Sequence, residues 1–335
     1  MKFIKNLFKK DERASFLQDI VKKAKADVKT IVLPESDDKR IFEAAEFLTK
    51  NKIANIVLLG EVGKINKLAN QFGVSLSSVT IHSIDTHKEK YAKRLVQKRK
   101  HKGVDKDKAM KLLENNMYYA CMMAEMGDVD GIVAGAKYTS KMSFIPALKL
   151  LKKKSDTFVS TYFIMAMKER LLLFADPALN INPTSKELGK IAINTAKAAK
   201  LLGIEPKIGM LSFSTHGSAH HDMVKKVQKA TTYVKRHSDF AVDGEIQVDT
   251  ALVPHVAKRK SPKSKIQGDA NILVFPDLNS GNISYKLVER LAGASAFGPV
   301  SYGFKVPMND LSRGCSSEDI IDLVAITCVE AQRMK

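Results

Sequence analysis

The 335-residue chain contains no tryptophan and only three cysteines, Cys121, Cys315 and Cys328. The cysteines show neither the spacing of a disulfide framework nor a CxxC pair that would hold zinc. A chain of this length buries enough surface to fold without disulfides or metals. We therefore expect a protein of a reducing compartment, the cytoplasm.

Long apolar runs are also missing, since none approaches the roughly 20 residues needed to cross a bilayer. The first ten residues are basic but lack the continuous apolar core of a signal peptide. Hydrophobic residues at 44% and charged residues at 27% are typical of an ordinary globular protein. The composition predicts a soluble protein with no membrane partner.

Acidic residues are outnumbered, because 55 Lys and Arg against 36 Asp and Glu give a formal charge of +19. Nucleic-acid binding is one interpretation, with Lys98-Arg99-Lys100-His101-Lys102 as the candidate contact. However, the other basic residues are spread along the chain, and aromatic residues for base stacking are sparse. A small polyanionic ligand explains the local basic cluster equally well, and we do not expect nucleic acid as a main partner.

The common nucleotide and hydrolase motifs are absent. Gly60-Glu61-Val62-Gly63-Lys64 lacks the spacing and the Ser or Thr of a P-loop, and no GxGxxG follows a strand. No GxSxG elbow is present either. His216 and His220 have a spacing that metal ligands can use, but without an HExxH pattern or paired cysteines we favour a polar loop. We expect no metal site and no cofactor.

Short apolar runs alternate with longer amphipathic stretches, which is typical of an α/β fold with largely parallel sheets. The pattern predicts a helix over 106–126, another that begins at Pro146, and a last one from near Ser316. The length favours two domains. We place the crossings between them near 150–156 and 298–304.

Two loops carry polar residues ahead of predicted helices, and the first of them follows a buried strand. In the first, Ser214, Thr215, Gly217 and Ser218 lie at a strand-to-helix turn, where backbone N–H groups can bind an anion. An ordinary capped loop explains the same residues equally well. In the second, over 307–319, Ser316 and Asp319 have the spacing of a capping box.

Arg313 belongs to the same second loop. It precedes the last helix, where a cation does not favour the helix dipole, so we expect its guanidinium to face an anion.

Several segments together resemble the phosphate acetyltransferases (phosphotransacetylases) of the phosphate acetyl/butyryltransferase family. Asn309 to Gly314 followed by Asp319-Ile320 resembles the C-terminal signature of that family. Three stretches are similar to the family's other conserved segments: 176–183, 243–251 (DGPLQxDAA) and 275–282 (FPDLNxGN). The loop 212–219 matches as well, and the resemblance extends over residues 28–333.

The resemblance implies reversible acetyl transfer between acetyl-CoA and phosphate, giving acetyl phosphate and CoA, with no further cofactor. It implies two three-layer α/β/α domains of the isocitrate/isopropylmalate dehydrogenase kind, an active-site cleft between them, and a homodimer. In the family the last helix returns to the first domain. We therefore assign residues 1–152 plus 300–335 to the first domain and 153–299 to the second, dimerising domain.

The resemblance also implies residue roles. Asp319 falls on the general base for the CoA thiol, Ser312 on the hydroxyl that steadies the thiol, and Arg313 on the ligand of phosphate. Further phosphate- or CoA-binding positions are Arg99, Asn309, Ser214, Thr215, Gly217 and Ser218.

Proton transfer from the CoA thiol to the Asp319 carboxylate is unfavourable when both groups have ordinary pKa values. Typical pKa values of about 3.9 for an aspartic acid and about 8.5 for a thiol correspond to a deficit of roughly 6 kcal/mol. Catalysis is therefore expected to depend on stabilising the thiolate. No covalent nucleophile is evident, so we expect direct acyl transfer.

One position departs from the family pattern, because Ile145 precedes Pro146 where the family usually has an arginine. Lys137 and Lys141 are close in sequence, but lysine lacks the bidentate fork of arginine. Two alternatives stay open. One is a phosphate butyryltransferase with a wider acyl pocket, and the other is a weakened enzyme that binds nucleic acid through its basic surface.

Overall fold

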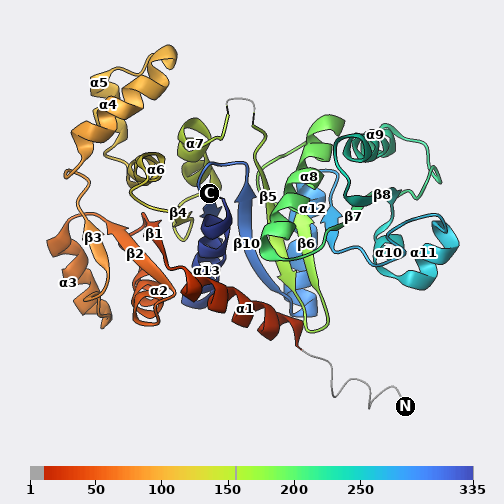
Figure 1. Ribbon diagram of the computed structural model, residues 1–335, viewed down its shortest axis with the longest axis horizontal. Coiled ribbons are helices and arrows are strands. Elements are labelled where there is room, and N and C mark those ends of the chain that lie inside the picture. The colour runs from red at the N-terminus through yellow and green to blue at the C-terminus, as the bar shows by residue number, and fades with distance from the viewer. Residues whose placement is uncertain (1–10, 155–156, 335) are drawn as a thin grey trace. The chain divides into compact units, whose positions relative to one another are not determined.

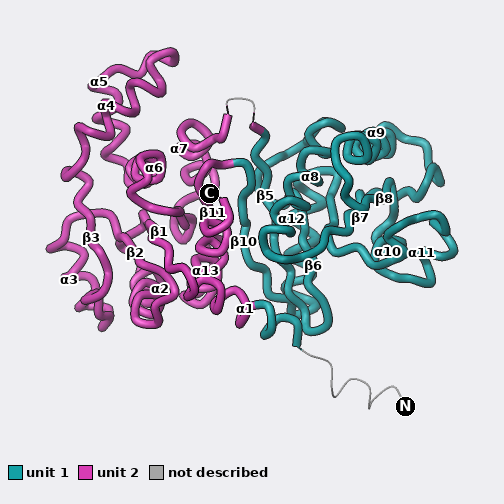
Figure 2. The backbone as a smooth tube through the Cα atoms, in the orientation of Figure 1, with its two compact units in different colours: residues 1–16, 158–303 teal, residues 17–157, 304–335 magenta. Residues whose placement is uncertain are grey.

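The computed structural model describes residues 11–154 and 157–334. The chain forms two compact units, which are distinguished in Figure 2. Unit 1 comprises residues 1–16 and 158–303, and unit 2 comprises residues 17–157 and 304–335. The crossings therefore lie at 157/158 and 303/304, compared with 152/153 and 299/300 in the sequence interpretation. The basic N-terminal run, residues 1–10, lies outside the described residues, and within them no helix is long and apolar enough to cross a membrane.

Unit 2 contains a five-stranded sheet in which all neighbouring strands are parallel. Its strands are short apolar runs with most side chains buried, the pattern of a parallel sheet covered on both faces. In sheet order they are β11 (Met308–Asp310), β4 (Gly131–Ala134), β1 (Lys29–Leu33), β2 (Ala54–Leu59) and β3 (Thr80–His82).

Helices lie on both faces of this sheet (Figure 1). Crossovers between parallel strands are right-handed. A helix that leads to a strand on one side therefore lies on one face of the sheet, and a helix that leads to a strand on the other side lies on the opposite face. One layer contains α2 and α13, which pack on each other, α2 also on β2 and α13 also on β1, whereas α6 packs on α7 and β4. The helices are α2 (Lys39–Lys50), α3 (Val62–Phe72), α4 (Lys88–Arg99), α5 (Lys106–Leu112), α6 (Asn116–Met126), α7 (Ser140–Leu150) and α13 (Ser317–Arg333), with a short 3-10 turn, Lys100–Lys102, after α4. Unit 2 thus has the expected three-layer α/β/α arrangement.

Unit 1 contains a six-stranded mixed sheet. The order is β10 (Ser295–Tyr302), β5 (Ser160–Ala166), β6 (Leu171–Ala175), β9 (Ile272–Val274), β7 (Lys207–Leu211) and β8 (Ala241–Ile246). The first three strands pair antiparallel and the rest pair parallel. Its helices are α8 (Ser185–Leu202), α9 (Asp222–His237), α10 (Val248–Leu252), α11 (Pro254–Lys260) and α12 (Leu278–Ala292), and α1 (Glu12–Ala26) spans the boundary between the units. The expected α/β class with largely parallel sheets is confirmed.

Two helix predictions were wrong in detail. The stretch 106–126 forms two helices, because the Asn115 side chain accepts the N–H groups of Met117 and Tyr118 and begins α6 there. Pro146 does not open a helix but lies inside α7, which Thr139 caps. Tertiary packing compensates for the hydrogen bond that the proline removes, because Phe144, Ala147 and Leu150 of α7 are buried.

Candidate active site

Three loops of unit 2 follow β1, β4 and β11 at the carboxyl edge of its sheet. Strand β11 pairs with β4, and the Leu311 N–H donates to the carbonyl of Ala134 over 2.7 Å. From β1 the sheet extends to β2 on one side and to β4 on the other, so the connections leave this point in opposite directions. In open α/β sheets, ligands bind outside the carboxyl ends of the strands at such a switch point.

The buried carboxylate of Glu35 organises the first two loops. It accepts four backbone N–H groups from the segment after β4, at 2.6 to 3.1 Å, from Gly135, Ala136, Lys137 and Tyr138. Because its acceptor sites are filled by the chain itself, Glu35 holds the loop in place and does not serve a ligand. Sequence reasoning missed this residue, although a carboxylate directly after a buried strand was the available signal.

Asp310, the last residue of β11, is a second buried carboxyl at this edge. Its Oδ1 has no hydrogen-bond partner among the described residues. Gly135 packs so closely that a Cβ there would lie 2.4 Å from this oxygen, which explains the glycine. Burial raises the pKa of Asp310 to about 7, and the charge of Glu35 acts in the same direction, while the hydroxyls of Ser143 and Ser140 oppose it.

The guanidinium of Arg40, in the first turn of α2, connects all three loops. It binds both carboxylate oxygens of Asp38, at 3.0 and 2.7 Å, and lowers the pKa of that carboxyl through this hydrogen bond. It also donates to the carbonyls of Ala136 (2.9 Å), Arg313 (3.0 Å) and Cys315 (2.7 Å).

The loop after β11 exposes the side chains of Ser312, Arg313 and Asp319. Its backbone turns tightly, because the carbonyl of Ser312 accepts the Cys315 N–H at 2.9 Å. The capping box is present, with the Asp319 N–H bound to Ser316 Oγ at 3.1 Å and the Ser316 N–H bound to Asp319 Oδ2 at 2.8 Å. The structure thus brings a hydroxyl, a guanidinium and a carboxylate to the solvent-facing start of α13.

The part of Asn309 in substrate binding stays a prediction. Its side chain is completely buried, and its amide donates to Thr327 Oγ1 at 2.9 Å and to Glu330 Oε2 at 2.8 Å, both on α13. In a strand, side chains alternate between faces, and position 309 points toward α13. Asn309 therefore fixes the helix that carries Asp319.

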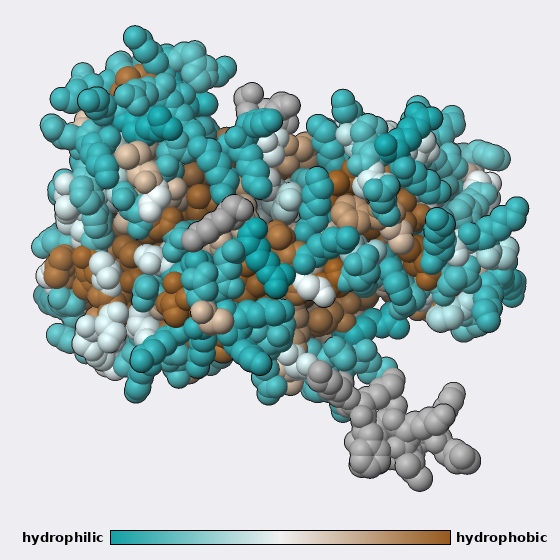
Figure 3. Space-filling model, viewed as in Figure 1, coloured by the Kyte–Doolittle hydropathy of each residue, from teal (hydrophilic) through white to brown (hydrophobic). Residues whose placement is uncertain are grey.

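Arg99, at the end of α4, is half-buried, and among the described residues no hydrogen bond or ion pair joins it to the 312–319 loop. Its neighbours Arg94 and Lys98 bind Glu125 at 2.8 and 3.1 Å. The surface over α4 and α5 is mostly hydrophilic (Figure 3). The structure leaves Arg99 on a polar, cation-rich helix, so its part in binding CoA stays a prediction.

In unit 1, the 212–219 loop follows β7 as expected, but its donors do not converge on open space. The Gly217 N–H and the Ser214 hydroxyl both donate to Glu245 Oε1, at 2.7 and 3.0 Å. The Thr215 N–H donates to the hydroxyl of Ser218 at 3.0 Å. A carboxylate of the chain takes the place where an anion was expected, so the alternative of an ordinary internally bonded loop describes these four residues.

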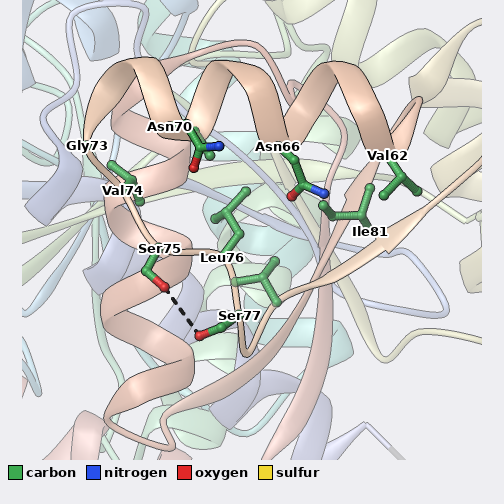
Figure 4. Close-up of a pocket in the computed structure, with 11 residues that line it drawn as sticks. Val62, Asn66, Asn70, Gly73, Val74, Ser75, Leu76, Ser77 and Ile81 are labelled. Atoms are coloured by element: carbon green, nitrogen blue, oxygen red, sulfur yellow. Dashed lines mark hydrogen bonds between the residues drawn. The ribbon is translucent and has the colours of Figure 1, made fainter.

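His216 of the same loop binds Ser261 Oγ at 2.8 Å and lies 3.4 Å from Asp243. Over residues 11–154 and 157–334, no three His, Cys, Asp or Glu side chains are grouped as metal ligands. A surface cavity of about 900 Å³ beside α3 is lined by apolar, Asn and Ser side chains and includes no charged residue (Figure 4). It offers no cationic ligand for a phosphate.

Comparison with known proteins identifies relatives over nearly the whole chain. The family described as Phosphate acetyl/butaryl transferase matches residues 15–328. A phosphate acetyltransferase of Clostridium acetobutylicum is 46% identical, over 95% of this chain and 98% of that protein. One of Thermoanaerobacterium thermosaccharolyticum is 44% identical, over 95% and 100%. A phosphotransacetylase structure from Streptococcus pyogenes is 38% identical, with a TM-score of 0.91 over 96% and 99% of the two chains.

The raised pKa of Asp310 predicts a pH-dependent effect of Asp310→Asn. The folded state holds this proton up to about pH 7, whereas the unfolded chain releases it from about pH 3.8. Ionisation of Asp310 therefore weakens the wild-type fold as the pH rises through this window, and an asparagine does not ionise. We expect the stability of the variant relative to wild type to increase by roughly 2.5 kcal/mol between pH 5 and pH 8.

Urea unfolding of both proteins at each pH measures this difference. A difference that is the same at pH 5 and pH 8 would contradict the raised pKa.

Proposed function

The chain belongs to the phosphate acetyl/butaryl transferase family, and on that premise we propose that the carboxyl edge of unit 2 is its acyl-transfer site. The reaction is the reversible transfer of an acetyl group between acetyl-CoA and phosphate. Relatives 44 and 46% identical, over essentially their whole lengths, are phosphate acetyltransferases, which supports acetyl over butyryl. The observation that carries the proposal is that Ser312 and Arg313 are exposed on a loop whose backbone Arg40 holds. The exposed Asp319 follows in the first turn of α13.

In the direction of acetyl phosphate synthesis, a phosphate oxygen attacks the thioester carbon, the carbon–sulfur bond breaks, and the CoA thiolate leaves. Arg313 binds two phosphate oxygens with its planar fork. The attacking phosphate gives its proton to the Asp319 carboxylate, which passes it to the departing thiolate. In the reverse direction the same carboxylate removes the thiol proton and returns it to the departing phosphate. Asp319 Oδ1 is open for this role, because the hydrogen bond that Asp319 accepts from the Ser316 N–H goes to its other oxygen, Oδ2.

Thiolate stabilisation comes from the surroundings of Asp319. The N-terminus of α13, a helix of 17 residues, carries partial positive charge beside this loop, and the Arg313 guanidinium adds a full charge. Ser312 donates a hydrogen bond from its hydroxyl to the sulfur.

With this stabilisation, we propose that the reaction needs no metal, nucleotide or other cofactor, in line with the motifs that the sequence lacks. The three buried free thiols support a cytoplasmic location.

A homodimer forms part of the proposal. On α12, Ile283, Leu287 and Leu291 are 57%, 51% and 82% exposed and share one helix face at a spacing of four residues. A continuous exposed apolar stripe of this kind typically marks an interface. A second copy is its occupant, because the same stripe on a two-fold-related helix is self-complementary.

The decisive assay is phosphate-dependent release of free thiol from acetyl-CoA by the purified chain, in the presence of EDTA. We expect rapid release that depends on phosphate, with a higher kcat/KM for acetyl-CoA than for butyryl-CoA. Release that is independent of phosphate would refute the proposed reaction. A preference for butyryl-CoA would establish the butyryltransferase alternative instead, and loss of activity in EDTA would contradict the absence of a metal.

The apolar stripe predicts that Leu287→Lys separates the dimer. Scattering measured on a sizing column should give twice 37.1 kDa for wild type and 37.1 kDa for the variant. The matched control is Val248→Lys, since Val248 is equally exposed, at 51%, but lies on α10. A Leu287→Lys protein that remains dimeric would place the interface elsewhere.

Replacing the proposed base, Asp319→Asn, should lower kcat at saturating substrate by more than tenfold and leave KM for CoA nearly unchanged. The asparagine oxygen can still accept the Ser316 N–H, so the cap is kept and only proton transfer is lost. Glu318→Gln is the control, because it removes an adjacent exposed carboxylate. A loss below tenfold excludes Asp319 as the essential base.

Arg313→Lys should be almost as harmful as Arg313→Ala. An ammonium acts as a point charge and cannot bind two phosphate oxygens in a plane. Lys137 is not free to substitute, because its Nζ binds Asp37 at 2.6 Å. We expect a loss of at least ~2 kcal/mol of transition-state stabilisation, about 30-fold in kcat/KM for phosphate. If the lysine variant keeps more than half of the wild-type value, charge alone is sufficient.

A further inference from the structure

We propose that Arg40 is a positioning residue for the acyl-transfer site, acting through the loop that carries Arg313. This inference rests on the function proposed above. All five N–H donors of its guanidinium are used, two by Asp38 and three by the backbone carbonyls of Ala136, Arg313 and Cys315. Arg40 touches no proposed substrate-binding side chain, so its effect must pass through the backbone.

The two carbonyls that Arg40 binds in this loop lie on either side of Gly314. One guanidinium nitrogen, NH1, donates to the carbonyl of Arg313 at 3.0 Å and to that of Cys315 at 2.7 Å. Both peptide groups are thereby turned toward α2, while the Arg313 side chain is exposed. The Arg313 side chain is the proposed ligand of phosphate, and its orientation is set by the hydrogen bonds that hold the peptide groups on either side of Gly314.

The other side of the guanidinium is anchored to fixed structure. Asp38 is the N-cap of α2, and its carboxylate accepts from the guanidinium as well as from the Arg40 backbone N–H at 2.9 Å. The carbonyl of Ala136 belongs to the loop that Glu35 holds through four N–H groups. Arg40 therefore ties this loop, which is otherwise held by its own turn and by the cap of α13, to the segments that follow β1 and β4.

Only arginine presents donors in the directions this arrangement requires. A lysine has three donors on one nitrogen, which cannot reach a carboxylate and three carbonyls in a planar fan. The loop lies at the surface, so carbonyls released by a lysine are hydrated rather than left buried. The expected consequence of Arg40→Lys is a disordered loop on a folded protein, which is a kinetic defect.

The test compares Arg40→Lys with wild type in the full chain by two independent measurements. In the thiol-release assay, kcat should fall at least tenfold while KM for CoA stays within twofold. Amide hydrogen exchange should become faster in the peptide covering 312–319. The control is Ile41→Val, the next residue of α2, whose fully buried apolar side chain cannot donate a hydrogen bond to the loop and which should retain wild-type kcat.

The double variant Arg40→Lys/Arg313→Lys separates positioning from a merely structural role. If Arg40 acts through Arg313, the double variant is no more than about threefold worse than Arg313→Lys alone, because the two losses overlap. Losses that multiply, or wild-type kcat in Arg40→Lys, would overturn the inference. If Arg40→Lys does not fold, Asp38→Asn loosens the same guanidinium and should give a smaller loss in the same direction, and wild-type kcat there overturns it equally.

The two proposals fail in different ways. Wild-type protein without phosphate-dependent thiol release contradicts the proposed function. Unchanged hydrogen exchange over 312–319 in Arg40→Lys contradicts the positioning role of Arg40, whatever reaction the site performs.

Discussion

The carboxyl edge of unit 2 depends on one buried charge, the carboxylate of Glu35, and on the four backbone N–H groups that surround it. A buried carboxylate is costly unless its acceptor sites are filled, so the loop after β4 has one arrangement that avoids this penalty. That arrangement places the Ala136 carbonyl where Arg40 binds it, and Arg40 in turn holds the loop of Arg313. The positions of the exposed groups proposed for catalysis therefore depend on the Glu35 carboxylate, which does not contact the substrate.

Three buried carboxylates, those of Glu35, Asp176 and Glu245, are bound by donors of the chain itself. Asp176 and Glu245 resemble Glu35, since each carboxylate accepts hydrogen bonds from the chain: Asp176 from the N–H groups of Thr161 and Ala178, and Glu245 from Gly217 and Ser214. These carboxylates belong to, or organise, segments by which the chain resembles its family, and their role is in the fold. Asp319 differs, because one oxygen is bonded in the helix cap and the other is open.

The sequence predicted best what depends on neighbouring residues. Apolar runs that alternate with amphipathic stretches indicated the α/β class, and the spacing of Ser316 and Asp319 indicated the capping box, because these signals are local. It failed where the partner is distant in the chain: Arg40 reaches the Arg313 carbonyl across 273 positions, and Glu245 reaches the 212–219 loop from another strand. The contacts of Asn309 with α13 were not predictable for a similar reason, since its motif does not show which face of β11 meets α13.

The most direct measurement is a crystal structure of the chain grown with CoA and phosphate. The account predicts a phosphate within hydrogen-bond distance of the Arg313 guanidinium in a bidentate arrangement, the CoA sulfur beside Asp319 and Ser312, and Arg40 still bound to the carbonyls of Arg313 and Cys315. A phosphate held by the 212–219 loop, with Glu245 displaced and Arg313 in solvent, would contradict it.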